Sequence, residues 1–456
     1  MTPDTAISPM SARAHLRALL VLGLPLIGSH LAEIAITVTD TLMVGWYSAT
    51  ALAGLTLAGV LYFSIFVLGS GFARAVMPIV ASAAGTDDDR QVRRVTRMGA
   101  WLSVIFGALA MPILIWSEGW LLAIGQAPEV VAEAALYLKI RAWGLIPALI
   151  IVVLISYLSS LERTRVILIV TLVTTAINIL LNYMLIFGNF GAPELGIAGA
   201  AVASVTMQVV GVLALGAYAA IVTPEYALFQ NPWRPDWDAF GRVLRLGWPI
   251  GLTGLAEVGL FSAASVMVGW IGARELAAHG IALQIASVTF MLHVGLSQAV
   301  TVRVGRAFGQ RDGPHLRMGA LVAMALSFAI AGATIVLFLT VPEPLIGLFL
   351  SPDDPARTVI IPVAVTLLAM AALFQFVDAA QVMTLGMLRG MQDTQAPMVI
   401  AAVSYWLIGA PASYALAFWA GLGAPGVWLG LVVGLACAGI LLSWRFLRLS
   451  AALNER

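Results

Sequence analysis

The chain of 456 residues is 61% hydrophobic and 10% charged, with a mean hydropathy of +0.97. A soluble chain carries roughly a quarter charged residues, so this composition indicates a protein embedded in lipid, with no large soluble domain. The net charge of +1 excludes a strongly basic nucleic-acid binder, and the single Cys437 excludes a disulfide framework or a cysteine-rich metal site. A transporter, a channel or an intramembrane enzyme remains.

The apolar segments predict an all-α integral membrane protein with twelve transmembrane helices, since about 20 residues suffice to cross a bilayer. The first apolar run continues to about Trp46. This run is too long for the hydrophobic region of a signal peptide, so we expect it to be retained as a helix. Eleven further segments follow at 51–82, 98–116, 136–160, 166–187, 195–222, 241–270, 276–302, 318–341, 359–388, 396–419 and 424–447.

The basic residues lie mostly in every second connection, a distribution that marks the cytoplasmic side of a membrane protein. Nineteen arginines, from Arg13 to Arg456, lie at the chain ends or after the second, fourth, sixth, eighth and tenth segments. The alternate connections contain four basic residues, which are Lys139, Arg141, Arg274 and Arg357. We therefore expect both termini to be cytoplasmic.

One fixed shift, which places position 23 on position 247, aligns the two halves of the chain without a gap. GLPLIGSHLAEI at 23–34 pairs with GWPIGLTGLAEV at 247–258, and MVGW at 43–46 recurs at 267–270. Two six-helix lobes with parallel topology are therefore expected, an arrangement that suits alternating access. The predicted division is an N-terminal lobe at 1–222, a proline-containing cytoplasmic linker at 223–240 and a C-terminal lobe at 241–456. Channels and some enzymes also contain repeats, so the repeat favours transport without proving it.

Acidic residues inside the predicted helices are the main candidates for function, because a buried charge costs at least about 2.5–3.5 kcal/mol on insertion scales. Glu33 and Asp40 share one helical face in the first half, and Asn178 and Asn182 belong to a polar stripe in 166–187. If the two faces meet, they form a site of carboxylate and amide oxygens. Such a site can bind a hard cation or exchange a proton, although polar residues can also serve only to bond helices together.

Two more acids, Glu257 and Asp378, lie in the second half, each with a phenylalanine one turn away, at Phe261 and Phe374. A carboxylate next to an aromatic face suits an organic cation. Phe290 is a weaker candidate for the same substrate surface. For the phenylalanines alone, the simpler interpretation is that they are ordinary residues of membrane helices.

Other polar motifs carry less weight. Asp87, Asp88 and Asp89 resemble half of an acidic metal motif, but no second cluster accompanies them, and acids are favourable at the start of a helix. An intramembrane enzyme would need a paired catalytic motif, which the sequence lacks, so we expect the protein not to be an enzyme. The glycines at positions 426, 430 and 434 predict a helix-packing face.

Five motifs in order along the chain resemble the multidrug and toxic compound extrusion (MATE) family, specifically its NorM-type bacterial branch. The resemblance covers nearly the whole chain. The motifs are VTDTLMVG at 38–45, NYMLIFGNFGAPELG at 182–196, AAH at 277–279, RVGRAFGQRD at 303–312 and DAAQVMTLGMLRG at 378–390.

The resemblance implies a MATE-type fold and an antiporter that exports organic cations and amphipathic drugs in exchange for sodium ions or protons. It implies a coupling site in the N-terminal lobe at Asp40, Asn178, Asn182 and Ser204, to which the spacing of Glu33 adds a further acid. It also implies that Glu257 and Asp378 bind ion and substrate in the C-terminal lobe. Sodium would bind at either group, and no further cofactor is expected.

The resemblance also implies a monomer in the bacterial inner membrane, in contact with the lipid bilayer and its drug substrates and with no nucleic-acid partner. Two positions depart from the family pattern, namely Glu33 in place of Gln and Gly280 after His279, with Gln284 one turn further on. The alternative within the same superfamily is a flippase or exporter of a lipid-linked or endogenous metabolite. That alternative would be expected to carry a cationic cavity, whereas the charges inside these helices are mostly acidic.

Overall fold

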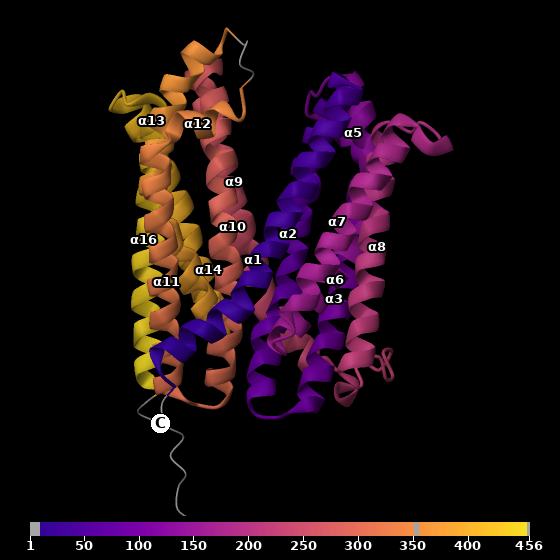
Figure 1. The fold of residues 1–456 in the computed structure, drawn as a ribbon, viewed down its shortest axis with the longest axis vertical. Coiled ribbons are helices and arrows are strands. Elements are labelled where there is room, and N and C mark those ends of the chain that lie inside the picture. The colour runs from indigo at the N-terminus through magenta and orange to yellow at the C-terminus, as the bar shows by residue number, and fades with distance from the viewer. Residues whose placement is uncertain (1–9, 351–354, 454–456) are drawn as a thin grey trace, which may run out of the picture. The chain divides into compact units, whose positions relative to one another are not determined.

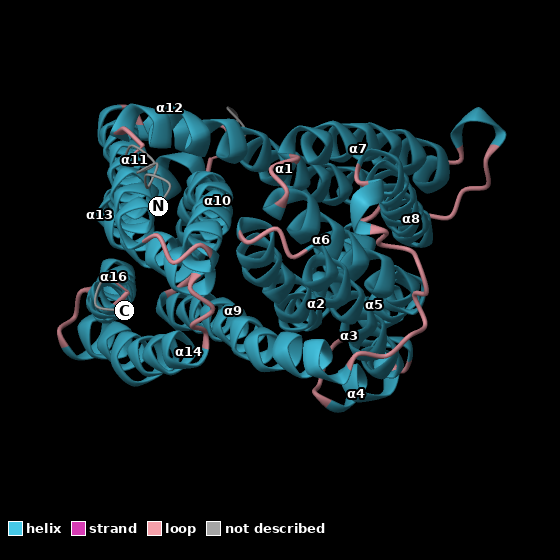
Figure 2. Cartoon of the chain, turned by 90° about the horizontal axis from the view of Figure 1, so that it is seen from below, coloured by secondary structure: helices cyan, strands magenta, loops and turns pink. Residues whose placement is uncertain are grey.

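A computed structural model describes residues 10–350 and 355–453, and in these ranges the chain forms helices and loops without strands (Figures 1 and 2). Arg456, one of the predicted cytoplasmic arginines, lies outside the described residues. Twelve helical spans are long and apolar enough to cross a membrane, which confirms the predicted fold class. The helices of the first half are α1 (Ala12–Tyr47), α2 (Ala49–Gly85), α3 (Asp89–Ile115), α4 (Ser117–Ala123), α5 (Pro128–Arg141), α6 (Leu145–Ser160), α7 (Thr164–Phe187) and α8 (Ile197–Val222).

The second half contains the same number of spans, one of which is broken into short pieces. Between Gln395 and Trp419, α-helical turns alternate with π-helical turns at Val403–Gly409 and Ala415–Trp419. The helices are α9 (Trp237–Ile271), α10 (Ala273–Gly309), α11 (Gly313–Thr340), α12 (Pro342–Gly347), α13 (Arg357–Gly390), α14 (Gln395–Ala402), α15 (Ala410–Tyr414) and α16 (Gly423–Ala452).

The repeat is visible in how the helices begin. The carboxylate of Asp88 accepts a hydrogen bond from Gln91 N, and that of Asp312 accepts one from His315 N, each at 3.0 Å. Both aspartates cap the following helix, α3 or α11, and they occupy equivalent positions of the repeat. Asp88 therefore has a structural role as a helix cap, which agrees with the prediction that the acids at 87–89 stabilise the start of a helix.

The chain divides into two compact units, and the division falls inside α1 and α9. The N-terminal unit is Gly28–Leu255, and the C-terminal unit combines the residues up to Ile27 with those from Ala256 onward. The predicted lobe boundary lies instead in the linker at 223–240. Each long helix therefore contributes its first half to one unit and its second half to the other. Pro25 and Pro249, which lie near the two division points, occupy equivalent positions of the repeat.

Close glycine contacts explain how these half-helices pack. In the N-terminal unit, a Cβ on Gly71 of α2 would overlap the backbone of Gly251 of α9. In the C-terminal unit, a Cβ on Gly295 of α10 would lie 2.7 Å from Ile27 N of α1. Gly71 is equivalent to Gly295 in the repeat, and Ile27 is equivalent to Gly251, so the same packing occurs twice.

The predicted linker packs against α3 within the N-terminal unit. Arg97 donates hydrogen bonds to the carbonyl oxygens of Gln230 and Asn231 at 3.0 and 2.8 Å. Arg94 forms an ion pair with Asp236, immediately before α9. These bonds hold the connection between α8 and α9 against α3.

The glycines of α16 form the packing face that their spacing predicts. A Cβ on Gly430 would overlap the backbone of Ser413, and one on Gly434 would lie 2.8 Å from the Cα of Gly409. Both partners belong to the irregular span 395–419. Because the glycines of α16 lack side chains, the backbone of α16 can lie close to the backbone of that span.

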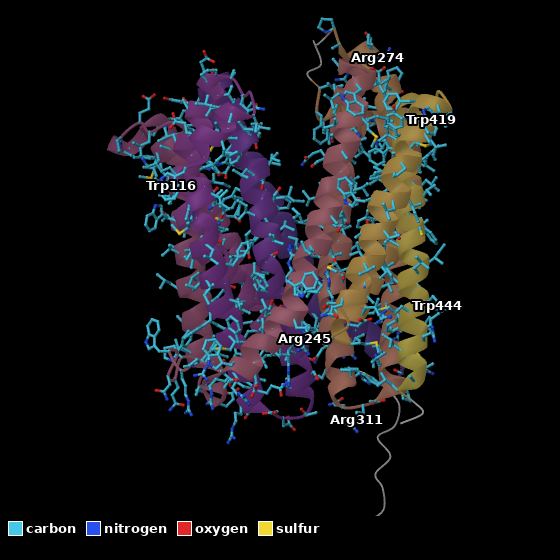
Figure 3. All side chains as sticks on the ribbon, turned by 180° about the vertical axis from the view of Figure 1, so that it is seen from behind. Trp116, Arg245, Arg274, Arg311, Trp419 and Trp444 are labelled. Atoms are coloured by element: carbon cyan, nitrogen blue, oxygen red, sulfur yellow. The ribbon has the colours of Figure 1, made fainter. Side chains whose placement is uncertain are left out.

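The outer surface of the helices is apolar, as lipid contact requires. Leu109, Leu213 and Ile440 each expose between 66 and 72% of their surface. In the C-terminal unit, Arg311 lies at one end of the helices, and Arg274 and Trp419 lie at the opposite end (Figure 3). Charged and aromatic side chains at helix ends are typical of membrane proteins.

Candidate functional site

A buried polar cluster in the N-terminal unit is centred on Asp40 of α1, which is 9% exposed. Asn182 of α7 donates a hydrogen bond from Nδ2 to Asp40 Oδ1 at 2.5 Å, and the same nitrogen donates to Asn178 Oδ1 at 3.2 Å. Ser204 of α8 donates from Oγ to Asp40 Oδ2 at 3.4 Å. The structure therefore brings together Asp40, Asn178, Asn182 and Ser204.

The predicted polar stripe of α7 is only partly directed at Asp40. Thr174 and Thr175 donate their hydroxyls to carbonyl oxygens of the preceding turn, at 2.8 to 3.0 Å. Threonine commonly bonds in this way inside a helix. Asn182 thus supplies the hydrogen bond to α1, and Asn178, which is also fully buried, accepts from Asn182.

Glu33 does not join the Asp40 cluster. Its Oε2 lies 3.0 Å from Nδ1 of His30 on the same helix, and 51% of its side chain is exposed. Arg74 of α2 adds an attractive electrostatic interaction. Asp40 lies seven positions after Glu33, which is about 10 Å along a helix. The two acids share a helical face, but their separation along the helix places them in different environments.

Three residues that the sequence analysis did not select complete the N-terminal cluster. The guanidinium carbon of Arg141 lies 4.5 Å from the ring centroid of Tyr62, and Arg141 interacts electrostatically with Tyr137 and Asp40. The distribution of basic residues predicted that Arg141 belongs to a connection. Pro128 was the available signal, because proline at the start of α5 places Arg141 at the far end of a full helix.

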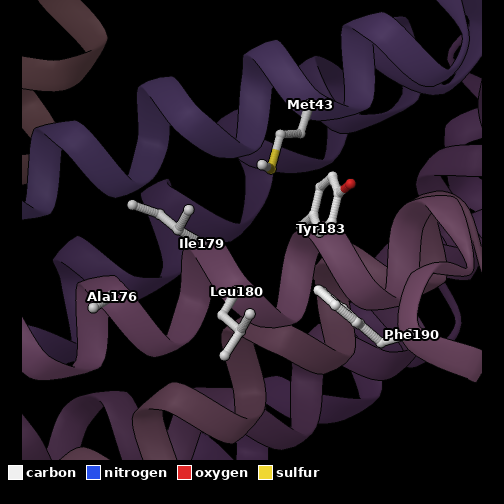
Figure 4. Close-up of a pocket in the computed structure, with 6 residues that line it drawn as sticks. All are labelled: Met43, Ala176, Ile179, Leu180, Tyr183 and Phe190. Carbon is white, nitrogen blue, oxygen red and sulfur yellow. The ribbon is translucent and has the colours of Figure 1, made fainter.

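An open, mostly apolar pocket of about 500 Å³ adjoins this cluster between α1 and α7 (Figure 4). Met43 lies one turn after Asp40, and Ile179 and Tyr183 follow the two asparagines directly in sequence. The residues that line the pocket are Met43, Ala176, Ile179, Leu180, Tyr183 and Phe190.

The second acidic site lies in the C-terminal unit around Asp378 of α13, which is fully buried. Neither of its carboxylate oxygens accepts a hydrogen bond from a described residue. Glu257 of α9 is half-buried and interacts with Asp378 through charge repulsion. The structure therefore places the two predicted acids of this half in one site.

Further polar atoms in the same unit are buried without a hydrogen-bond partner among the described residues. They include both polar side-chain atoms of Gln375 and the oxygens Gln381 Oε1 and Ser404 Oγ. Gln381 uses its Nε2 to donate to Tyr405 Oη at 2.5 Å. Buried polar groups normally find partners, so these side chains could bind water or an ion.

An aromatic cluster adjoins Asp378. The rings of Phe261 and Phe374 meet edge to face at 5.8 Å, and Phe374 meets Trp428 at 5.9 Å. Trp428 donates from Nε1 to His279 Nδ1 at 3.1 Å, and His279 Nε2 lies 3.0 Å from Ser265 Oγ. Because Nδ1 accepts, Nε2 carries the proton, and these two bonds hold the imidazole in one orientation.

The two remaining predictions for this half concern Phe290 and Gly280. Phe290 is half-buried on α10 and, in the described part of the chain, has no ring contact with the Phe261 cluster. Gly280 is exposed, and a Cβ there would meet no atom within 4 Å. Glycine at position 280, which departs from the family pattern, thus leaves open space next to His279, whose imidazole is held by two hydrogen bonds.

The MatE family model matches residues 25–184 and 249–415. The two matches begin at positions 25 and 249, which are equivalent in the internal repeat. The family match, together with the twelve apolar helices, identifies a multi-pass membrane transporter rather than an enzyme. The chain belongs to the MatE family and is of the MATE/NorM type.

Two relatives extend over nearly the whole chain. The "Probable multidrug resistance protein NorM" of Rhizobium meliloti (strain 1021) is 49% identical, covering 97% of this chain and 96% of its own length. The protein of the same name from Agrobacterium fabrum (strain C58 / ATCC 33970) is 45% identical, covering 96 and 94%.

Solved structures of MATE proteins share the fold. One, described as "Crystal structure of MATE in complex with MaL6", has a TM-score of 0.89 at 20% identity and covers 97% of this chain and 98% of its own. Another, described as the "Outward-facing conformation of a multidrug resistance MATE family transporter of the MOP superfamily", has a TM-score of 0.88 and covers 96% of each chain. At this identity the likeness establishes the fold alone.

Proposed function

We propose that the protein is a multidrug efflux antiporter that exports organic cations and amphipathic drugs in exchange for sodium ions or protons. The names of the relatives support multidrug export. The observation that carries the proposal is the fully buried Asp378, whose carboxylate has no hydrogen-bond partner among the described residues and adjoins Glu257 and Phe374.

The substrate class follows from the chemistry around Asp378. An organic cation would neutralise the repulsion between Asp378 and Glu257, and the rings of Phe261 and Phe374 would supply an aromatic face. A strongly anionic substrate would add a third negative charge to this site. The acids therefore favour cationic over anionic cargo.

Coupling requires that ion and drug each bind one conformational state better than the other, because only differential affinity shifts an equilibrium. In the proposed cycle, coupling ions enter from outside, occupy the carboxylates and displace the bound drug. The ion-loaded protein then opens inward, releases the ion and rebinds drug. Asp40 with Asn178 and Asn182, or Glu257 with Asp378, would accept the ion. The repeated halves suit such alternating access.

We further propose that the protein functions as a monomer in the inner membrane of a bacterium, with both termini in the cytoplasm. The bacterial sources of the relatives and the distribution of arginines among the connections support this location.

Efflux of a fluorescent cationic dye from proteoliposomes tests the proposed function. We expect dye export when an inward ion gradient is imposed and loss of that export in Asp378→Asn. Glu129→Gln, which neutralises an exposed acid in the first turn of α5, is the matched control and should transport normally. Export of an anionic lipid-linked probe in place of the dye would favour the flippase alternative.

A further inference from the structure

Two histidines and an arginine meet in the C-terminal unit, at the end of the helices that Arg311 marks in Figure 3. Nη2 of Arg303, near the end of α10, lies 3.3 Å from Nδ1 of His15 in α1 and 3.2 Å from Nε2 of His315 in α11. The two imidazole rings are 4.5 Å apart between their centroids. These three side chains, called here the histidine–arginine cluster, thus join the starts of α1 and α11 to the end of α10.

The hydrogen bonds of the cluster require both histidines to be neutral. A guanidinium has only donors, so the imidazole nitrogens that face Arg303 must accept. The proton of His15 is then on Nε2, which is buried and has no hydrogen-bond partner among the described residues. A proton on Nδ1 of His15 or on Nε2 of His315 would turn that acceptor into a donor and oppose two donors.

The charges around the imidazoles also oppose protonation. The groups that act electrostatically on the two histidines are Arg303, Asp312 and the histidines themselves. Arg303 repels the protonated form of both rings. Asp312 attracts it, but acts on His15 less strongly than Arg303 does, and its carboxylate already accepts from His315 N as the cap of α11. A proton on either ring therefore adds a second positive charge beside the guanidinium and weakens the cluster.

The internal repeat shows that packing alone does not require these ionisable groups. The positions equivalent to His15 and Arg303 in the N-terminal unit hold Ala239 and Ile79, which are both buried. The third position holds a neutral glutamine. Apolar residues thus fill the positions in one unit that a histidine and an arginine occupy in the other. The cluster therefore adds a sensitivity to protons that its equivalent lacks.

The cluster holds only the start of α1. A Cβ on Gly319 would lie 3.3 Å from Nδ1 of His15, so glycine there leaves room for the imidazole beside α11. Further along α1, the close contact of Ile27 with Gly295 of α10 involves no titratable side chain. Loss of the cluster should therefore release the first turns of α1 and leave the contact at Ile27 in place.

We propose that His15, Arg303 and His315 form a pH-sensitive latch, which holds the start of α1 at neutral pH and releases it when the cytoplasm becomes acidic. The side of the membrane on which the latch senses pH rests on the proposed orientation of the termini. The latch itself is independent of the proposed transport cycle, and it adds a response to pH that is separate from the buried carboxylates.

Proton linkage sets the size of the response. On release, a proton from the solvent bonds to the imidazole nitrogen that had accepted from Arg303, and it returns to the solvent when the pH rises. A released imidazole in water titrates near pH 6.5, whereas the latched ring stays neutral. Between about pH 7.5 and pH 5.5 the released population should therefore rise about 10-fold if one histidine is protonated and about 100-fold if both are.

Hydrogen exchange of the purified full-length protein in detergent tests the latch without measuring transport. Mass spectrometry compares the protection of the amides of residues 15–22 near pH 7.5 and near pH 5.5, corrected for the pH dependence of the intrinsic exchange rate. Protection should fall about 10- to 100-fold at the lower pH. Residues 239–246 at the start of α9 are the internal control, because they occupy equivalent positions of the repeat without the cluster, and their protection should stay constant.

The double variant His15→Gln with His315→Gln keeps neutral acceptors for Arg303 but cannot bind a proton, so its protection should be the same at both pH values. His30→Gln, which changes a histidine of α1 outside the cluster, is the matched control and should respond as wild type. Equal protection of residues 15–22 in wild type at both pH values would overturn the inference, and so would an undiminished response in the double variant.

If the double variant does not fold, the wild-type comparison of residues 15–22 with 239–246 still decides. An equal loss of protection in both segments would show a general effect of acid and overturn the latch. Failure of dye export would refute the proposed function and leave this exchange result standing.

Discussion

Asn182 Nδ2 donates to Asp40 Oδ1 at 2.5 Å and thereby joins α7 to α1 inside the N-terminal unit. The two residues are 142 positions apart in the sequence. Ser204 of α8 donates to the other oxygen, so side chains of two further helices, α7 and α8, bond to the carboxylate of Asp40. A change in the protonation of this one carboxyl therefore alters the contacts among three helices.

We predict that Asp40→Asn abolishes ion-driven dye efflux but leaves the fold intact. The amide has nearly the same shape and still accepts a hydrogen bond, but it cannot carry the charge or exchange a proton. Proteoliposome efflux measures the loss, and gel-filtration behaviour with Tm measures the fold. The exposed Glu343→Gln at the start of α12 is the control. Efflux at the wild-type rate in Asp40→Asn would show that this carboxyl takes no part in coupling.

The aromatic cluster next to Asp378 gives a second prediction. Phe374→Ala removes the ring that contacts both Phe261 and Trp428, so cationic dye should bind more weakly and the KM for efflux should rise. Phe290→Ala, on the same unit but outside the cluster, should change KM much less. Equal effects of the two substitutions would indicate that general loss of apolar surface, rather than this cluster, determines substrate affinity.

The repeated glycine contacts give a prediction for stability. Gly71→Leu should destabilise the protein by about 1–3 kcal/mol or more, because the new side chain must displace the backbone of α9. Gly295→Leu should have a similar cost at the equivalent contact with α1. Gly59→Leu is the control, since a Cβ there meets no atom within 4 Å. Thermal unfolding in detergent measures all three, and an unchanged Tm for Gly71→Leu would contradict the close packing.

The ion pair between Arg94 and Asp236 predicts a pH-dependent contribution to stability. The hydrogen bond from Arg94 holds the pKa of Asp236 below its ordinary value. A lowered pKa in the folded state means that the stabilisation is present above the unfolded value of about 3.9 and is lost as pH falls through the folded value. Since Arg94 is 39% exposed, the pair contributes about 1 kcal/mol or less.

Asp236→Asn isolates this contribution, because asparagine can still cap α9 where Asp236 Oδ1 accepts from Ala239 N at 3.1 Å. The difference in Tm between wild type and Asp236→Asn should be largest near pH 7, should shrink as pH falls below the unfolded value of about 3.9, and should vanish below the lowered folded pKa. Asp238→Asn removes the same charge two residues away and should have a smaller effect. A difference that stays constant from pH 7 to pH 3.5 would exclude the ion pair as its cause.

The sequence predicts the fold well because both of its signals are strong. Apolar runs define the twelve spans, and the pairing of Gly71 with Gly295 and of Pro25 with Pro249 reveals the repeat. The sequence does not show that α1 and α9 each divide between two compact units, since that depends on backbone contacts such as Gly71 with Gly251. The π-helical turns of the span 395–419 likewise have no signal in apolar periodicity.

The candidate site was predictable where helical spacing and residue type agreed. Asp40 and Asn182 meet as expected, and Glu257 interacts with Asp378. Glu33 shares the helical face of Asp40 but pairs with His30. Spacing along a helix shows which residues share a face, but it does not show which of them lie close enough to interact. Arg141 was counted with the charges of a connection although the predicted segment 136–160 contains it, and its contact with Tyr62 depends on the packing of helices that are distant in sequence.

The most direct test of cation antiport is dye efflux from proteoliposomes in which a sodium gradient and a pH gradient are imposed separately. We predict that an inward ion gradient drives cationic dye out against its own gradient, and that Asp40→Asn and Asp378→Asn both abolish this movement. Dye movement under neither gradient, or full activity in both variants, would contradict the proposed antiport.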